Sequence, residues 1–196
     1  MKLFKILTAI GGACLVGATA FVYFGVFNVA ADDPHTKPVY WLLETLRERS
    51  IAIRARDIAV PPLDDPTLIS AGGADYNEMC TGCHLQPGVE QSELAAAMYP
   101  RPPSLARVKR ERPAETFWII KHGIKMSGMP AWGATHDDPR MWAIVAFLQQ
   151  LPRLTPAQYQ ILTTRNADDM NGHAHSDGNM REMVMPPSDR ANVRAQ

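Results

Sequence analysis

The stretch Cys80-Thr81-Gly82-Cys83-His84 decides how the rest of this 196-residue chain is organised. Two thiols three positions apart lie on one side of a helical turn, so both can bond to the same group. The residue that follows them, His84, adds an imidazole that can bind iron as an axial ligand. The C-x-x-C-H spacing is typical of covalent attachment of one c-type haem through its two vinyl groups.

Three other uses of a cysteine pair compete with haem attachment. A redox-active C-x-x-C is expected within a βαβ pattern, and no strand pattern of any length is found in the sequence. A zinc site needs further ligands, and the third cysteine, Cys14, stands alone in an apolar segment. A disulfide would consume both thiols of the motif. Haem attachment is therefore the favoured interpretation.

Length and charge set the outline of the protein. The chain is long enough for one domain with appendages, and its 20 basic and 20 acidic residues give a net charge of +0. This balance provides no argument for nucleic acid as a partner. We divide the chain into a membrane anchor (residues 1–31), a connector (32–69), a haem domain (70–165) and a disordered tail (166–196).

The amino terminus predicts a transmembrane anchor. Lys2 and Lys5 precede Ile6–Ala31, which contains no charged residue. As a helix this run is about 39 Å long, against about 30 Å for the hydrocarbon core. The alternative is a signal peptide cleaved after Val29-Ala30-Ala31, although its apolar core is usually only about 7–15 residues long. Positive residues stay in the cytoplasm, so the haem motif is expected on the periplasmic side of a bacterial inner membrane.

The patterns that remain predict helices only, so the expected fold class is all-α. Apolar residues at helical spacing, opened by proline or capping residues and ended by glycine or proline, mark each helix. Helices are expected after Pro38, over Ala71–Met79, from Pro113 to Gly123, from Asp138 to Pro152, and after Thr155. Gly123 suits a left-handed cap, Asp138 an N-cap, and Thr155 with Gln158 a capping box. The prolines between Val60 and Pro66 predict extended chain.

A second iron ligand is expected from a loop. Met129 lies between Gly128 and Pro130, and a thioether on a rigid loop can coordinate iron opposite His84. Met126 is the runner-up but lacks the proline flank. His122 would give a bis-histidine haem instead, and an open sixth position would favour gas binding or peroxide chemistry.

Residues 70–154 resemble a class I cytochrome c domain. The resemblance rests on Gly73-Ala74-Asp75-Tyr76 before the haem motif, on Ser127-Gly128-Met129-Pro130-Ala131-Trp132, and on Trp142 with Phe147 before Leu151-Pro152. It implies a few helices around one covalent haem c, with Met129 as the sixth ligand.

The same resemblance implies contacts around the haem. The first and last helices of such domains cross, which would place Gly73 or Ala74 against Trp142 or Phe147. A proline carbonyl after the motif fixes the proximal histidine, and Pro87 matches that position. Three side chains are candidates to bind the haem propionates: Arg101, Trp118 and Trp132.

The expected function is one-electron transfer by a membrane-anchored, non-enzymatic haem protein. Its partners would be a redox-protein donor and acceptor, and the chain can equally be the cytochrome subunit of a dehydrogenase or oxidase complex.

An alternative function is that of a haem sensor with a displaceable Met129. A third hypothesis assigns copper binding to the tail, through His173, His175 and its methionines. The basic excess between Arg101 and Lys125 has two interpretations: it steers a partner to the haem edge, or it is a solvated basic loop.

Overall fold

The computed structural model describes residues 1–108 and 111–164, and every regular element in this part of the chain is helical. The all-α fold class is therefore confirmed. The helices are α1 (Lys2–Tyr23), α2 (Lys37–Ala55), α3 (Pro66–Met79), α4 (Thr81–His84), α5 (Glu93–Ala97), α6 (Pro113–His122), α7 (Asp138–Gln150) and α8 (Pro156–Thr163), with 3-10 turns η1 (Trp132–Ala134) and η2 (Leu151–Arg153). The predictions of a disordered tail and of copper binding by it lie outside the described residues.

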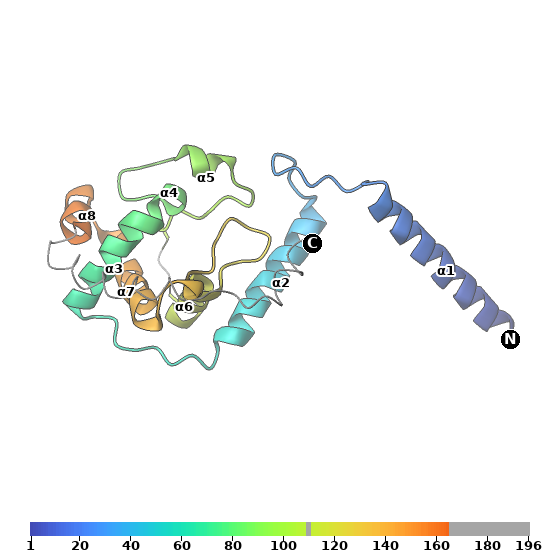
Figure 1. Cartoon of the computed structure of the whole chain (residues 1–196), viewed down its shortest axis with the longest axis horizontal. Coiled ribbons are helices and arrows are strands. Elements are labelled where there is room, and N and C mark those ends of the chain that lie inside the picture. Colours follow the sequence, from blue (N-terminus) through green and yellow to red (C-terminus); the bar gives the residue numbers. More distant parts are fainter. Residues whose placement is uncertain (109–110, 165–196) are drawn as a thin grey trace, which may run out of the picture.

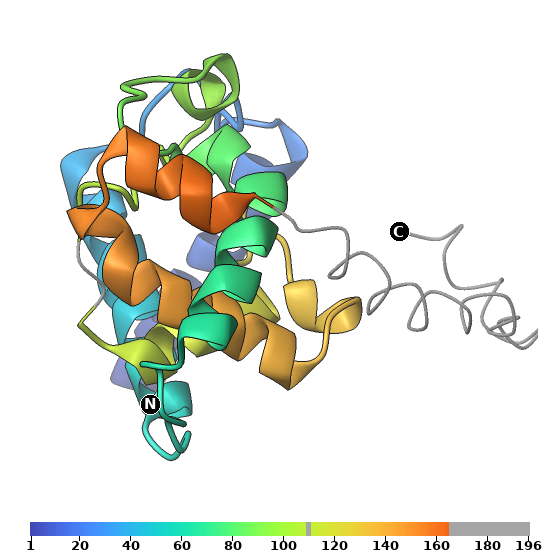
Figure 2. The same ribbon diagram turned by 90° about the vertical axis from the view of Figure 1, so that its left-hand side faces the viewer.

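The crossing of α3 and α7 forms the centre of the domain (Figure 2). Gly72 lies against the backbone of Ala143, where no β-carbon would fit. A β-carbon on Gly73 would meet the Phe147 ring at 3.0 Å, so the predicted contact between Gly73 and Phe147 is confirmed. Trp142, the other predicted partner, instead stacks on Phe117 with ring centroids 4.1 Å apart.

Local signals set the ends of these helices. Asp65 accepts a hydrogen bond from the Thr67 amide, so α3 begins at Pro66, earlier than the sequence predicted. In α7 the capping residue is Asp137, one position before the predicted Asp138. Thr155 and Gln158 form the predicted capping box of α8.

A buried ion pair ties α3 to α7. Arg140 donates from Nε to Asp75 Oδ2 at 2.7 Å and from Nη2 to Oδ1 at 2.9 Å. The Asp75 side chain is 3% exposed and that of Arg140 is 27% exposed. This two-point contact fixes the rotation of α3, the helix that leads into Cys80.

Helix α8 packs against α3 and completes the core. Tyr159 packs edge-on against Tyr76, with ring centroids 6.5 Å apart, and also contacts Phe147. Its hydroxyl donates to Asn77 Oδ1 at 2.9 Å, so α8 is attached to the turn of α3 that precedes the haem motif.

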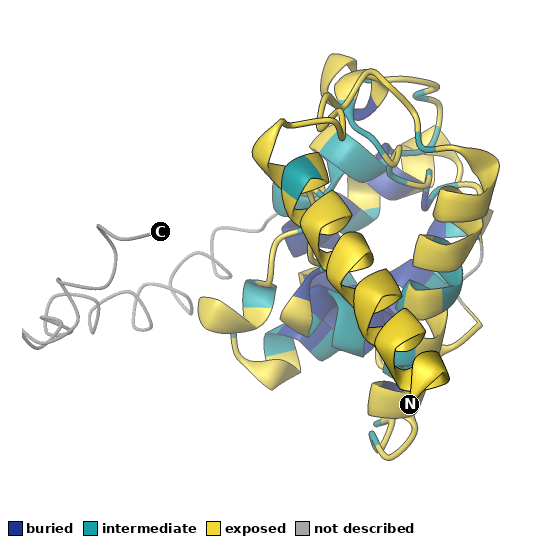
Figure 3. Ribbon diagram, turned by 90° about the vertical axis from the view of Figure 1, so that its right-hand side faces the viewer, coloured by how far each residue is buried: buried dark blue, intermediate teal, exposed yellow. Residues whose placement is uncertain are grey.

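The two amino-terminal helices differ in how they relate to the domain. Ile51 and Ala55 of α2 are buried, and α2 packs against α6. Helix α1 buries no residue and is apolar and long enough to cross a membrane (Figures 1 and 3). It is shorter than the apolar run, since the chain turns at Gly25, whose φ is +61°.

Candidate haem site

The cysteine motif occupies the junction between α3 and α4. The Cys83 and His84 amides both donate to the Cys80 carbonyl, at 3.2 and 2.8 Å, which closes a tight helical turn. Both thiols are half-buried and neither forms a disulfide. Immediately after the turn Leu85 adopts a φ of +63°, which redirects the chain and buries the Leu85 side chain.

The electrostatics of Cys80 argue against a redox-active dithiol. Burial, with a smaller contribution from the charge of Asp75, raises the pKa of the Cys80 thiol to about 12. Reactive cysteines need a lowered pKa, because the thiolate is the nucleophile in disulfide exchange. The thioredoxin-like interpretation of this pair is therefore disfavoured.

The imidazole of His84 is held through its Nδ1 atom. Nδ1 lies 2.9 Å from the Pro103 carbonyl oxygen. Since a carbonyl only accepts, Nδ1 carries the proton and the lone pair is on Nε2, the form that binds a metal. The prediction that Pro87 supplies this carbonyl was wrong. Arg101-Pro102-Pro103 is irregular chain, so its carbonyl groups are available for such a contact.

Two further bonds hold the backbone around His84. The Leu105 amide donates to the His84 carbonyl at 3.1 Å, and the Tyr76 hydroxyl donates to the Leu85 carbonyl at 2.6 Å. Burial raises the pKa of Tyr76, so its hydroxyl keeps the proton that it donates. The imidazole therefore rests on a backbone fixed from both α3 and the 103–105 segment.

The Met129 loop folds back on itself. The Ile124 amide donates to the Met129 carbonyl at 3.2 Å, and the Met129 amide donates to Ser127 Oγ at 3.2 Å. Gly123, with a φ of +64°, is required at the start of the loop because a β-carbon there would lie 2.7 Å from the Met129 carbonyl oxygen. The Met129 side chain is partly buried against the hydrophobic core.

The two alternative iron ligands, Met126 and His122, are both exposed. Met126 is 90% exposed and adopts a φ of +60° at the tip of the loop. His122 is exposed and packs against Trp118, with ring centroids 4.9 Å apart. Partial burial thus favours Met129 over both residues.

Sequence reasoning missed one neighbour of the Met129 loop. A β-carbon on Gly128 would collide with the side chain of Met98, which follows α5. Helix α5 itself was not predicted, and the available signal was Ser92, whose hydroxyl accepts from the Ala95 amide. The segment after the motif therefore folds over the loop that carries Met129.

The candidate propionate ligands receive no further support. Arg101 is exposed, and Trp132 packs edge-on against His136 with ring centroids 5.3 Å apart. Three members of the basic excess form ion pairs, and two of these pairs are with acidic residues outside the 101–125 stretch, which reduces the excess. These pairs are Arg107–Glu90, Arg112–Glu115 and Lys121–Asp138.

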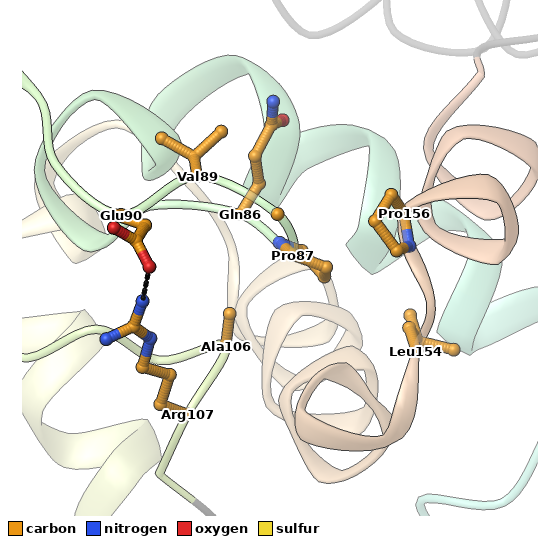
Figure 4. Close-up of a pocket in the computed structure, with 9 residues that line it drawn as sticks. Gln86, Pro87, Val89, Glu90, Ala106, Arg107, Leu154 and Pro156 are labelled. Atoms are coloured by element: carbon orange, nitrogen blue, oxygen red, sulfur yellow. Dashed lines mark hydrogen bonds and ion pairs between the residues drawn. The ribbon is translucent and has the colours of Figure 1, made fainter.

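A pocket of about 270 Å³ opens beside residues 86–90, which follow the motif (Figure 4). Pro87, Ala106, Leu154 and Pro156 line it, and the Glu90–Arg107 ion pair lies at one edge. Neither the motif residues nor Met129 line this pocket. In the described part of the chain, no cluster of three histidine, cysteine or acidic residues could hold a metal ion.

The donor set and its supports fit a covalently bound haem. Two thiols can attach such a haem, and an imidazole with its lone pair on Nε2 can bind its iron. The thioether of Met129 is a candidate for a second iron ligand. Residues 67–148 match the family model described as "Cytochrome C oxidase, cbb3-type, subunit III". No curated protein and no solved structure matched the chain. Residues 67–148 therefore form a c-type cytochrome domain, whose cofactor is a covalently attached haem.

Proposed function

We propose that this domain carries one electron at a time between redox proteins at a membrane, through a haem with His84 and Met129 as axial ligands. The observation that carries the proposal is the bond between His84 Nδ1 and the Pro103 carbonyl, because it selects the metal-binding tautomer. When bound, the haem supplies an iron that takes up and releases a single electron.

The residues of the chain would hold His84 and Met129 in place whether the iron is oxidised or reduced. Pro103 and Tyr76 hold the backbone and ring of His84, while Ser127 and Gly123 hold the backbone of Met129. A rigid pair of axial ligands reduces the reorganisation that accompanies each electron transfer. The thioether favours the reduced iron and so raises the reduction potential.

We further propose that α1 anchors this domain on the periplasmic side of a bacterial inner membrane. Lys2 and Lys5 at its start follow the positive-inside rule. Anchoring confines the domain near membrane-bound redox partners and raises their effective concentration. The description of the matching family favours a second candidate, in which the chain is a cytochrome subunit of an oxidase complex.

Replacing each methionine in turn tests the ligand assignment. Met129→Ala is expected to abolish the methionine–iron charge-transfer band of the ferric protein, to lower the potential, and to allow rapid carbon monoxide binding to the ferrous form. The matched control, Met126→Ala, is expected to keep the wild-type spectrum because Met126 is 90% exposed. Covalent haem content, measured by haemochrome absorbance, confirms that both variants mature.

Two results would contradict the proposal. Loss of the band in Met126→Ala with its retention in Met129→Ala would reassign the ligand. Rapid carbon monoxide binding by the wild-type ferrous protein would show an open or displaceable site and favour the sensor hypothesis over the carrier.

A further inference from the structure

Helix α2 has a second apolar face that the domain does not cover. Val39, Leu42, Leu46 and Ile53 are spaced by three, four and seven positions, so they share one side of the helix, and Leu43 flanks them. We call these five residues the outer stripe. Leu42, Leu46 and Ile53 are 59%, 64% and 59% exposed.

The opposite side of α2 faces the domain. Glu44, Glu48, Ile51 and Ala55 share that side by the same spacing rule, and Ile51 and Ala55 are buried there. Both glutamates of α2 therefore lie away from the outer stripe. A helix that needed only one packed face would leave polar residues on its other side.

Basic residues accompany the outer stripe. Arg49 and Arg56 each follow a stripe residue by three positions, after Leu46 and Ile53, and so lie beside it. Arg56 directly follows the last residue of α2 and also pairs with Asp57 at 3.0 Å, whereas Arg49 forms no ion pair with any residue that the structure describes. An apolar stripe flanked by arginine, with acidic groups on the far side, is the pattern of a helix that lies in the interface of an anionic bilayer.

The connection to α1 keeps α2 near the membrane. Residues 24–36 join the two helices, and even a fully extended chain of that length reaches only about 45 Å. The linker is also attached to the domain, because the His35 amide donates to the Tyr99 hydroxyl at 3.1 Å and the His35 ring packs edge-on against the Tyr99 ring, with centroids 5.4 Å apart. Helix α2 begins beside this attachment, next to the linker from α1 (Figure 1).

We propose that the outer stripe of α2 lies in the interface of the same bilayer that α1 crosses, and so sets the orientation of the haem domain. This inference rests on the proposed anchoring by α1. The occupant is the lipid surface, because basic flanks match anionic headgroups and α1 is directly continuous with the site through the linker. The domain would then present one fixed side, and not a freely rotating surface, to membrane-bound partners.

Nitroxide labels on the full haem-loaded chain test this inference. Leu46→Cys places a label on the outer stripe, Glu48→Cys places one on the opposite side of α2, and Leu15→Cys reports on α1, each in a Cys14→Ala background. The proteins are reconstituted in nanodiscs of phosphatidylethanolamine and phosphatidylglycerol. Accessibility to oxygen, which concentrates in lipid, is compared with accessibility to a water-soluble nickel chelate.

The expected result is a several-fold higher oxygen-to-nickel ratio at position 46 than at position 48, with position 15 deep in the bilayer. Equal aqueous accessibility at positions 46 and 48, with position 15 in lipid, would overturn this inference and leave the anchor intact. Shielding of position 46 from both reagents would also overturn it, by showing that protein covers the stripe. An aqueous position 15 would instead refute the anchor, and the inference with it.

Discussion

Replacing Arg140 with glutamine is expected to destabilise the haem domain by about 3 kcal/mol. The change leaves the Asp75 carboxylate, whose side chain is 3% exposed, without the guanidinium that donates to both of its oxygens. Removing one partner of a buried ion pair lowers the free energy of unfolding by about 3–5 kcal/mol, because the charge that remains is poorly solvated. Arg140 is itself 27% exposed, which admits water and places the expected cost at the lower end.

The matched control is Arg112→Gln. Arg112 donates to both oxygens of Glu115 at 3.0 and 3.2 Å, so the chemistry of the pair is the same. The Arg112 side chain is 73% exposed, however, and such surface pairs contribute only about 0.2–1 kcal/mol. The comparison therefore isolates the effect of burial.

Denaturant unfolding of the detergent-solubilised ferric protein, followed by haem absorbance, measures both changes. For a domain of about 100 residues, 3 kcal/mol corresponds to a fall in Tm of roughly 12–24 °C. An Arg140→Gln variant that loses no more stability than Arg112→Gln would refute the reasoning, since burial would then make no difference to the pair.

Two further predictions concern packing and capping. Gly72→Ala is expected to destabilise the domain by about 2–3 kcal/mol despite the better helix propensity of alanine, because the new methyl group would overlap the Ala143 backbone. Gly82→Ala, whose nearest neighbour would lie at 3.9 Å, is its control, and equal midpoints in thermal unfolding would disprove the clash. Thr155→Ala is expected to cost about 1 kcal/mol by removing the cap that it shares with Gln158. Amide exchange in α8 should quicken, and unchanged exchange would show that the cap contributes nothing.

Signals that act over a few residues can be interpreted from the amino-acid sequence alone. The spacing of Cys80, Cys83 and His84 depends only on one helical turn, so it predicted the haem site directly. The capping box of Thr155 and the left-handed φ of Gly123 are also local, and both were confirmed. The match of residues 67–148 to a cytochrome family confirms the fold and the cofactor that these signals indicated. The assignment of Met129 as a ligand stays a prediction.

Contacts between distant segments could not be predicted in the same way. The partner of His84 Nδ1 proved to be Pro103 and not Pro87, because the path of an irregular loop depends on what it packs against. The pair Asp75–Arg140 joins residues 65 positions apart and has no sequence pattern of its own. The basic excess between Arg101 and Lys125 is also smaller in the folded chain than along the sequence. Arg107 and Lys121 pair with Glu90 and Asp138, which lie outside that stretch.

The sequence by itself determined the haem attachment site, the helical class and the apolar amino-terminal helix, because each depends on the spacing of neighbouring residues or on composition. Only the tertiary structure decided which carbonyl orients His84, how α3 is fixed to α7, and that α2 keeps an apolar stripe outside the domain. The physical reason is that periodicity shows which residues share a face of a helix, whereas burial depends on which other elements that face meets.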